Sequence, residues 1–289
     1  SDTKIRFIFS SSLAVFGGGK AGNIMSPNPN AIAAADTFHL PLTSVMMAGI
    51  IPALFGLILT YFLAKRLINK GSKVTDKEVI VLETQNLPSF LTALVAPLVA
   101  ILLLALRPLF DIKVDPLIAL PLGGLIGALC MGKLRNINSY AINGLSKMTP
   151  VAIMLLGTGA LAGIIANSGL KEVLIQGLEH SGLPSYILAP ISGVLMSLAT
   201  ASTTAGTAVA SNVFSSTLLE LGVSSLAGAA MIHAGATVFD HMPHGSFFHA
   251  TGGSVNMDIK ERLKLIPYES VVGLMMTIVS TLIFGVFKF

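Results

Sequence analysis

The segment Met25-Ser26-Pro27-Asn28-Pro29-Asn30 decides the fold, because it interrupts apolar sequence with two prolines that remove backbone donors and forbid a continuous helix. The same layout occurs again at Phe239-Asp240-His241-Met242-Pro243-His244. Each copy follows a glycine-rich, small-residue helical sequence and precedes a second proline with an apolar span, at Pro52 and Pro267 respectively. The chain therefore contains an internal repeat.

The composition excludes a soluble globular protein. Of the 289 residues, 53% are hydrophobic and only 11% are charged, whereas about 25% are charged in an ordinary soluble domain. The formal charge is +4, but a mean hydropathy of +0.80 leaves too little polar surface for a nucleic-acid binder. A single cysteine, Cys130, excludes an intramolecular disulfide and a cysteine-rich metal site. The lipid bilayer is the expected surrounding.

Five apolar runs are close to the length that crosses about 30 Å of hydrocarbon as a helix. They are residues 44–63, 90–106, 116–131, 148–166 and 271–287. Residues 184–219, 225–239 and 5–16 are apolar but short or interrupted, and they predict broken or re-entrant segments. The run at 5–16 is expected to end in a polar, glycine-rich loop at Gly17-Gly18-Gly19.

Basic residues gather at 65–77, 133–147 and 260–264, which the positive-inside rule assigns to the cytoplasm. The span after Pro52 leads into such a cluster and the span after Pro267 leaves one, so the two cross in opposite directions. This predicts an all-α polytopic membrane protein with inverted-topology repeats and broken or re-entrant helices. Residues 1–75 are expected to end a first repeat, 76–89 to form a cytoplasmic linker and 90–289 to form the second repeat. A natural protein of somewhat more than about 400 residues is expected on this basis.

The first polar constellation spans residues 17–30. Its freed carbonyls, with the side chains of Asn23, Ser26, Asn28 and Asn30, can bind a hydroxylated substrate or a cation. A helix that restarts near Ala31 would point its N-terminal N–H groups at an anion. The alternative is a loop outside the membrane.

The second constellation is the hydroxyl-rich stretch 198–207, in which Ser202, Thr203 and Thr204 are the candidate substrate ligands. Hydroxyls are cheap to bury and can turn toward a polyol or a carboxylate. The alternative is a small-residue face for helix packing.

The third constellation, residues 233–249, holds four of the six histidines. A metal site is disfavoured because no HExxH pattern is present and the histidines do not share one helix face. Asp240 and His241 are better explained as a proton-titrating pair, since ionisable groups at membrane depth are costly and usually functional. The alternatives are a solvated pair at the interface, a capping role for Asp240, and an intramembrane histidine–metal enzyme.

Residues 22–33, 199–208, 239–241 and 259–270 resemble the gluconate permease family, proton symporters for sugar acids and related small carboxylates. The resemblance implies helical hairpins in inverted repeats, an elevator-like movement and proton-coupled uptake across a bacterial inner membrane. It implies a transporter of a small organic anion, with no enzyme activity and no cofactor. The coupling ion would be H⁺, with Na⁺ as the alternative, and a homodimer is left open.

One departure from the family affects the expected substrate. In the family a serine precedes the histidine and an asparagine–aspartate pair follows it, whereas here Asp240 precedes His241. Citrate–metal symporters have similar asparagine–proline motifs, so a di- or tricarboxylate is the alternative substrate.

Overall fold

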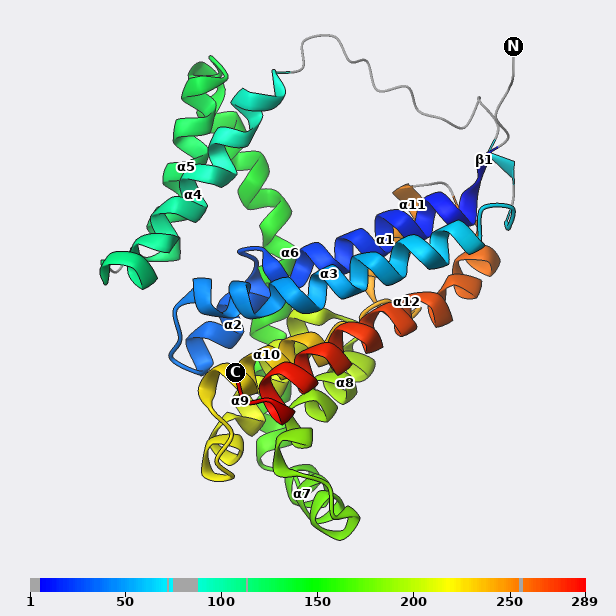
Figure 1. Ribbon diagram of the computed structural model, residues 1–289. Coiled ribbons are helices and arrows are strands. Elements are labelled where there is room, and N and C mark those ends of the chain that lie inside the picture. Colours follow the sequence, from blue (N-terminus) through cyan, green and yellow to red (C-terminus); the bar gives the residue numbers. More distant parts are fainter. Residues whose placement is uncertain (1–5, 72, 75–87, 113, 255–256) are drawn as a thin grey trace.

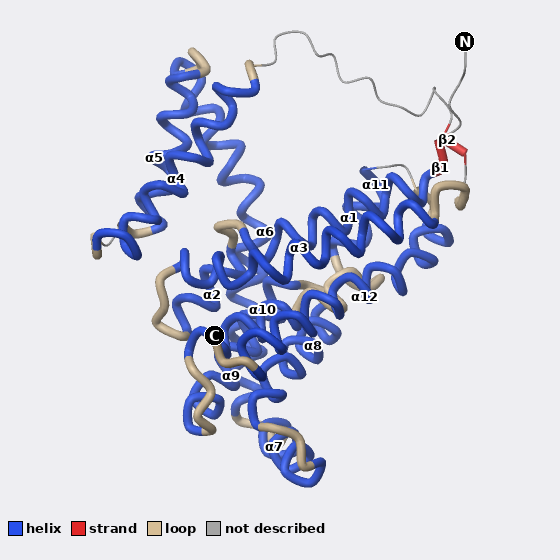
Figure 2. The backbone as a smooth tube through the Cα atoms, in the orientation of Figure 1, coloured by secondary structure: helices blue, strands red, loops and turns tan. Residues whose placement is uncertain are grey.

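The computed structural model describes residues 6–71, 73–74, 88–112, 114–254 and 257–289. Its helices in chain order are α1 (Ile8–Met25), α2 (Pro29–Thr37), α3 (Leu42–Arg66), α4 (Phe90–Phe110), α5 (Pro116–Cys130), η1 (Leu134–Asn136), α6 (Ile137–Ala166), α7 (Leu170–Ser181), η2 (Ser185–Ile187), α8 (Leu188–Thr200), α9 (Thr203–Glu220), α10 (Ser225–Gly235), α11 (Ser246–Ser254), α12 (Ile259–Thr281) and the π-type η3 (Leu282–Val286). Two-residue strands, β1 (Arg6–Phe7) and β2 (Lys73–Val74), pair antiparallel (Figure 2). The prediction of an all-α chain is confirmed apart from this short pairing.

Three helices in the described part are long and apolar enough to cross a membrane. They span Leu42–Arg66, Phe90–Arg107 and Ile259–Val286 and match three of the predicted spans. The predicted span 116–131 is the shorter α5, and the span 148–166 is the second half of α6. Most of the predicted linker at 76–89 lies outside the described residues.

The predicted loop at Gly17-Gly18-Gly19 is wrong, because α1 continues through these glycines to Met25. Tertiary packing explains the difference. A Cβ atom at Gly17 would lie 2.3 Å from Oγ1 of Thr60, and a Cβ atom at Gly49 would lie 1.9 Å from the carbonyl oxygen of Ile24. The glycines therefore let α1 and α3 approach closely, as small residues do between membrane helices.

Helices α8 and α10 meet in the same way and reciprocally. A Cβ atom at Gly193 of α8 would lie 2.3 Å from the carbonyl oxygen of Ile232, and one at Gly235 of α10 would lie 2.4 Å from that of Pro190. Each helix thus contributes a glycine against the backbone of the other. The main hydrophobic core surrounds this contact and includes Met231 and Phe214.

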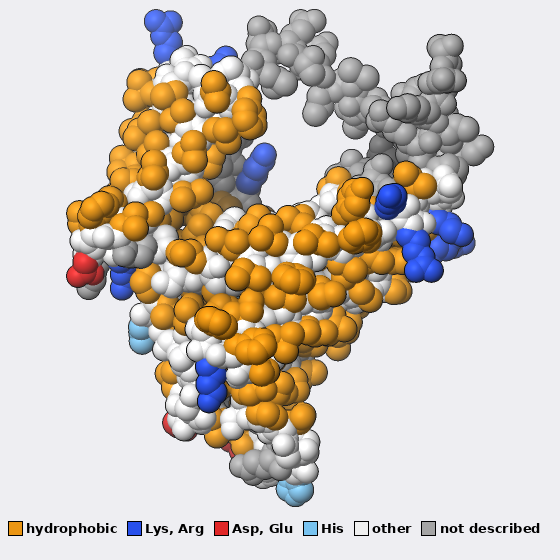
Figure 3. All heavy atoms as spheres, in the orientation of Figure 1, with side chains coloured by type: hydrophobic (Ala, Val, Ile, Leu, Met, Phe, Trp, Pro, Cys, Tyr) orange, Lys and Arg blue, Asp and Glu red, His pale blue; other side chains and the backbone are white. Residues whose placement is uncertain are grey.

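Helices α1, α3 and α12 run side by side, and α3 ends where α12 begins (Figure 1). The two long helices therefore run in opposite directions, with Met276 of α12 against Gly56 of α3. Basic side chains gather at this end of an otherwise apolar face (Figure 3). Exposed lysines and arginines at the end of α3 and the start of α12 supply this charge: Lys65, Arg66, Lys260 and Lys264. The repeat relation itself stays a prediction.

Capped breaks divide the helices that carry the polar constellations. Asn28 caps α2 by accepting a hydrogen bond of 2.9 Å from the backbone N–H of Ala31, so α2 begins at Pro29, slightly before the predicted restart near Ala31. Ser202 caps α9 through the N–H of Ala205 after Ala201 adopts the left-handed conformation that ends α8. A third break separates α10 from α11.

Candidate functional site

A buried lysine–aspartate–histidine cluster connects α1 to the break after α10. Lys20 of α1 is 1% exposed, and its ammonium group forms an ion pair with Oδ1 of Asp240. The same Nζ donates to the carbonyl oxygen of Thr237 at 2.6 Å and lies 2.9 Å from Nδ1 of His241. Three partners thus surround one buried cation.

The hydrogen bonds of His241 identify its protonation state. Nε2 lies 3.0 Å from the carbonyl oxygen of Ile266, which can only accept, and 3.1 Å from the Ser270 hydroxyl. Nδ1 lies 2.9 Å from Nζ of Lys20 and 3.1 Å from Oδ1 of Asp240. Because the nearer ammonium group can only donate, Nδ1 is assigned as the acceptor and the imidazole as neutral, with hydrogen on Nε2. Lys20 and Asp240 then compensate each other's charge inside the cluster.

An asparagine cluster occupies the break between α1 and α2. The side-chain amide of Asn28 donates to the backbone and side-chain oxygens of Asn23 and, at 3.1 Å, to the Ser26 hydroxyl. Asn30, which is 2% exposed, donates to Oδ1 of Asn23 at 2.9 Å and lies 3.3 Å from Nε2 of His233. The break is therefore held by amide groups rather than left open.

The first turn of α9 joins both clusters. Thr203 donates a hydrogen bond of 2.6 Å to Oδ2 of Asp240, and Thr204 donates one of 2.6 Å to Oδ1 of Asn30. Two adjacent hydroxyls thus bridge the lysine–aspartate–histidine cluster and the asparagine cluster.

A cavity of about 420 Å³ lies where these elements meet. Its wall contains Lys20 and Asn23 from α1, residues 201–204 at the start of α9, Asp240, and Ser246 and Phe247 at the start of α11. The volume lies within the range of small-molecule sites, roughly 300–1,000 Å³. Two helix N-termini, of α9 and α11, face it with the partial positive charge that favours anions.

Most of the sequence-predicted site residues come together here. Asn23, Thr203, Thr204, Asp240 and the cap Ser202 line the cavity. Asn28 and Asn30 lie one hydrogen bond further away, through Asn23 or Thr204, and Ser26 lies behind Asn28. His241 is fully buried behind Asp240.

Two contributors were missed by sequence reasoning, Lys20 and His233. Lys20 stands alone in the small-residue stretch of α1, and an isolated cation inside an apolar segment is a signal that could have identified it. His233 was counted in the histidine-rich constellation but not as a site residue, because its contact with Asn30 joins residues that are 203 positions apart.

The remaining histidines of the third constellation do not converge. His244 contacts the carbonyl oxygen of Leu198 at 3.1 Å and His249 that of Pro243 at 2.8 Å. In the part of the chain that the structure describes, no group of three or more His, Cys, Asp or Glu side chains is placed to hold a metal ion. The described residues thus lend no support to the metalloenzyme alternative.

A second buried ion pair lies beside the site. Arg262 of α12 binds both carboxylate oxygens of Glu269 and donates to the Thr251 hydroxyl of α11 at 3.2 Å. Its guanidinium group stacks over the rings of Phe16 of α1, at 4.4 Å, and Phe248 of α11, at 4.8 Å. Arg262 therefore ties three helices together.

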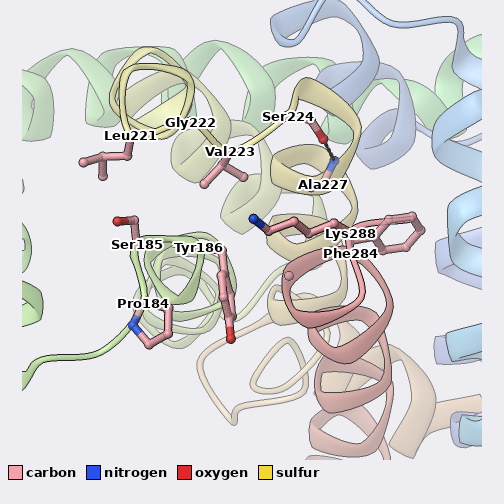
Figure 4. Close-up of a pocket in the computed structure, with 11 residues that line it drawn as sticks. Pro184, Ser185, Tyr186, Leu221, Gly222, Val223, Ser224, Ala227, Phe284 and Lys288 are labelled. Carbon is pink, nitrogen blue, oxygen red and sulfur yellow. Dashed lines mark hydrogen bonds between the residues drawn. The ribbon is translucent and has the colours of Figure 1, made fainter.

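Another cavity, of about 380 Å³, lies between η2, the α9–α10 loop and η3, and its wall shares no residue with either cluster. The Lys288 side chain points into it past Tyr186, while Ser224 caps α10 through the N–H of Ala227 (Figure 4). Its wall contains no acidic residue and none of the predicted site residues. The 420 Å³ cavity is thus the better candidate site.

A helical membrane protein with polar side chains in a cavity at broken helices is an arrangement found in many transporters, and known proteins similar to this chain are described as transporters. Residues 92–181 match the model of a Na+-H+ antiporter family.

The chain is 99% identical over 277 residues to a Haemophilus influenzae protein (strain ATCC 51907 / DSM 11121 / KW20 / Rd) described as an uncharacterized transporter. The match covers 96% of this chain, which spans 66% of the length of that relative. The chain is also a distant relative, at 23% identity, of the high-affinity gluconate transporter of Escherichia coli (strain K12), with 98% of this chain and 70% of that protein covered. No solved structure matches the chain significantly.

Proposed function

We propose that the protein is a secondary transporter that carries a small hydroxylated carboxylate, gluconate or a related sugar acid, together with a proton across a bacterial inner membrane. The observation that supports this most is the 420 Å³ cavity, which combines a buried cation, hydroxyls and two helix N-termini. The cation and the helix ends suit a carboxylate. The hydroxyls and amides suit the hydroxyl groups of a polyol.

The distant similarity to a gluconate transporter supports the same substrate class. Citrate and other di- or tricarboxylates are the alternative substrates, and they would bring more negative charge than the Lys20 ammonium can balance. We therefore expect a monocarboxylate. Asp240, next to His241 and on the cavity wall, is the proposed proton carrier.

Transport by the intact protein in liposomes tests the proposal. Radiolabelled gluconate, further sugar acids and citrate are offered with an inward proton gradient, an inward Na⁺ gradient or no gradient. We expect a sugar acid to accumulate under the proton gradient alone. Accumulation driven by Na⁺ alone, or of citrate in preference to every monocarboxylate, would contradict it.

The family match over residues 92–181 favours one second candidate, exchange of Na⁺ for H⁺. That activity needs no organic anion. It would appear in the same liposomes as a pH gradient that external Na⁺ dissipates in the absence of any carboxylate.

A further inference from the structure

Resting on the proposed function, we infer that Lys20 is the substrate-binding cation, and that the substrate carboxylate replaces Asp240 as its partner when Asp240 takes up the coupled proton. The donors of Lys20 support an exchange of partners. An ammonium group has three donors, and those of Lys20 are directed at Thr237, Asp240 and His241. A carboxylate in the cavity can therefore bind Lys20 only by displacing one of these partners.

Asp240 is the partner that a proton can release. Its Oδ1 accepts from Lys20 and its Oδ2 accepts from Thr203. A protonated carboxyl group is neutral and becomes a donor, which removes the charge that Lys20 needs. Because Lys20 and Asp240 line the same cavity, a substrate carboxylate there can supply that charge instead.

Counting charges gives the stoichiometry. Lys20 and Asp240 sum to zero in the empty site. A proton alone would make the site +1 and a carboxylate alone would make it −1, whereas both together restore zero. An uncompensated buried charge is strongly unfavourable. Only the empty site and the fully loaded site are thus suited to reorient, so one proton accompanies each monocarboxylate and uptake moves no net charge.

The other ionisable groups around the pair leave this count unchanged. His241 is assigned as neutral, because its Nε2 faces the Ile266 carbonyl oxygen and its Nδ1 lies nearer to the Lys20 ammonium group than to Asp240. Glu269 of α12 lies close enough to interact electrostatically with His241, but Arg262 compensates its charge through two contacts. His233 of α10 faces Asn30 rather than Asp240.

The first test compares wild type with Asp240→Asn in the intact, reconstituted protein. Asparagine cannot take up the proton and leaves Lys20 without a counter-charge, so the carboxylate binds at every pH. We expect the affinity of wild type for the carboxylate to fall about tenfold per pH unit once the pH exceeds the range in which Asp240 is protonated, as one linked proton requires. The affinity of Asp240→Asn should not change with pH. Exchange of substrate for substrate should survive, while the accumulation ratio under a proton gradient should drop to about 1 because no proton accompanies the substrate.

Two variants accompany this measurement. Asp36→Asn changes an exposed aspartate of α2 and should keep normal coupling. The double variant Lys20→Met/Asp240→Asn removes both charges, so no unpaired charge remains to unfold the protein. We expect it to fold, as judged by thermal unfolding, and to lose carboxylate binding by at least about 100-fold.

The second test needs no variant. For a carrier that moves one net charge, an imposed K⁺ diffusion potential would change the accumulation ratio by more than about tenfold. We expect no change for wild type. If wild type transports no carboxylate, both the proposed function and this inference fail. If wild type transports a carboxylate but responds to the potential, or if the double variant binds it normally, only this inference is overturned. If Asp240→Asn still concentrates the carboxylate, the assignment of Asp240 as proton carrier fails together with this inference, while proton-coupled carboxylate transport itself stands.

Discussion

The hydroxyl of Thr204 donates a hydrogen bond of 2.6 Å to the side-chain oxygen of Asn30, although 174 residues separate the two. This bond joins the start of α9 to the start of α2, so it connects two helix breaks that lie far apart in the sequence. Asn30 is almost completely buried, and its amide group is occupied by Asn23 and His233. The geometry of one break therefore depends on the other.

Replacement of Thr204 by valine keeps the shape of the side chain but leaves the Asn30 oxygen without this donor. We expect the affinity for the proposed carboxylate substrate to fall by an amount equivalent to about 1–3 kcal/mol, the cost of an unpaired buried polar group. Thr149→Val is the control, because Thr149 is exposed and its hydroxyl donates to the carbonyl oxygen of Leu145 in its own helix. Calorimetric titration measures both variants. Strictly additive effects of Thr204→Val and Asn30→Ala in a double-mutant cycle would contradict coupling between the breaks.

The orientation predicted from the basic clusters can be tested by cysteine labelling. Cys130 is exposed and is first replaced by serine. Single cysteines at Lys70 and Lys260 should then react only from the cytoplasmic side, and one at Phe289 only from the periplasmic side. All three positions are exposed in the structure. Periplasmic labelling at Lys70 would show that the orientation is inverted.

Gly49→Ala tests the close packing of α1 on α3. The added methyl group would overlap the Ile24 carbonyl oxygen, which belongs to backbone and cannot rotate away. We expect a loss of stability of about 1–3 kcal/mol, typical of overpacking. Gly18→Ala, in α1, meets no atom within 4 Å and should be neutral or stabilising, because alanine is the better helix former. Thermal unfolding in detergent compares them, and equal melting temperatures would refute the packing argument.

Arg262→Met should destabilise the protein strongly, by about 3–5 kcal/mol, because it leaves Glu269 charged and buried without a partner. Adding Glu269→Leu to this variant removes the orphaned charge and should restore most of the stability. The free energy of unfolding of the single and double variants distinguishes the two effects. A double variant less stable than Arg262→Met would mean that the Glu269 carboxylate stabilises the fold through another partner.

The positions of the breaks could be predicted from sequence because their causes are local. Pro27 lies in the break and Pro29 opens α2, where the missing N–H of proline removes no helical hydrogen bond, and Asn28 and Ser202 belong to the residue types that cap a helix. The three-glycine run was misjudged because glycine is a weak helix former and the sequence does not show what packs against it. In the structure Gly17 lies against Thr60 of α3, whereas a Cβ atom at Gly18 or Gly19 would meet nothing within 4 Å, so the close approach of α3 accounts for the first glycine alone.

The candidate site was predictable in its parts and not in its assembly. Asparagines, hydroxyls and the Asp240–His241 pair carry recognisable chemistry in the sequence. Their shared cavity depends on contacts such as Lys20 with Asp240, across 220 residues, which no local pattern encodes. Lys20 is an isolated charged residue in a glycine-rich stretch, and its role depends on the ion pair that it forms with Asp240.

The reciprocal contact of Gly193 and Gly235 limits how this protein can diverge. Two helices that touch through their backbones have no layer of interchangeable side chains between them, so drift at either position cannot be absorbed by repacking. Homologues with other cargo are therefore expected to keep these two glycines and to differ at the cavity wall. Redesign of the cargo would have to follow the same route, by exchanging wall side chains such as Phe247 or Asn23 while the α8–α10 pair is kept unchanged.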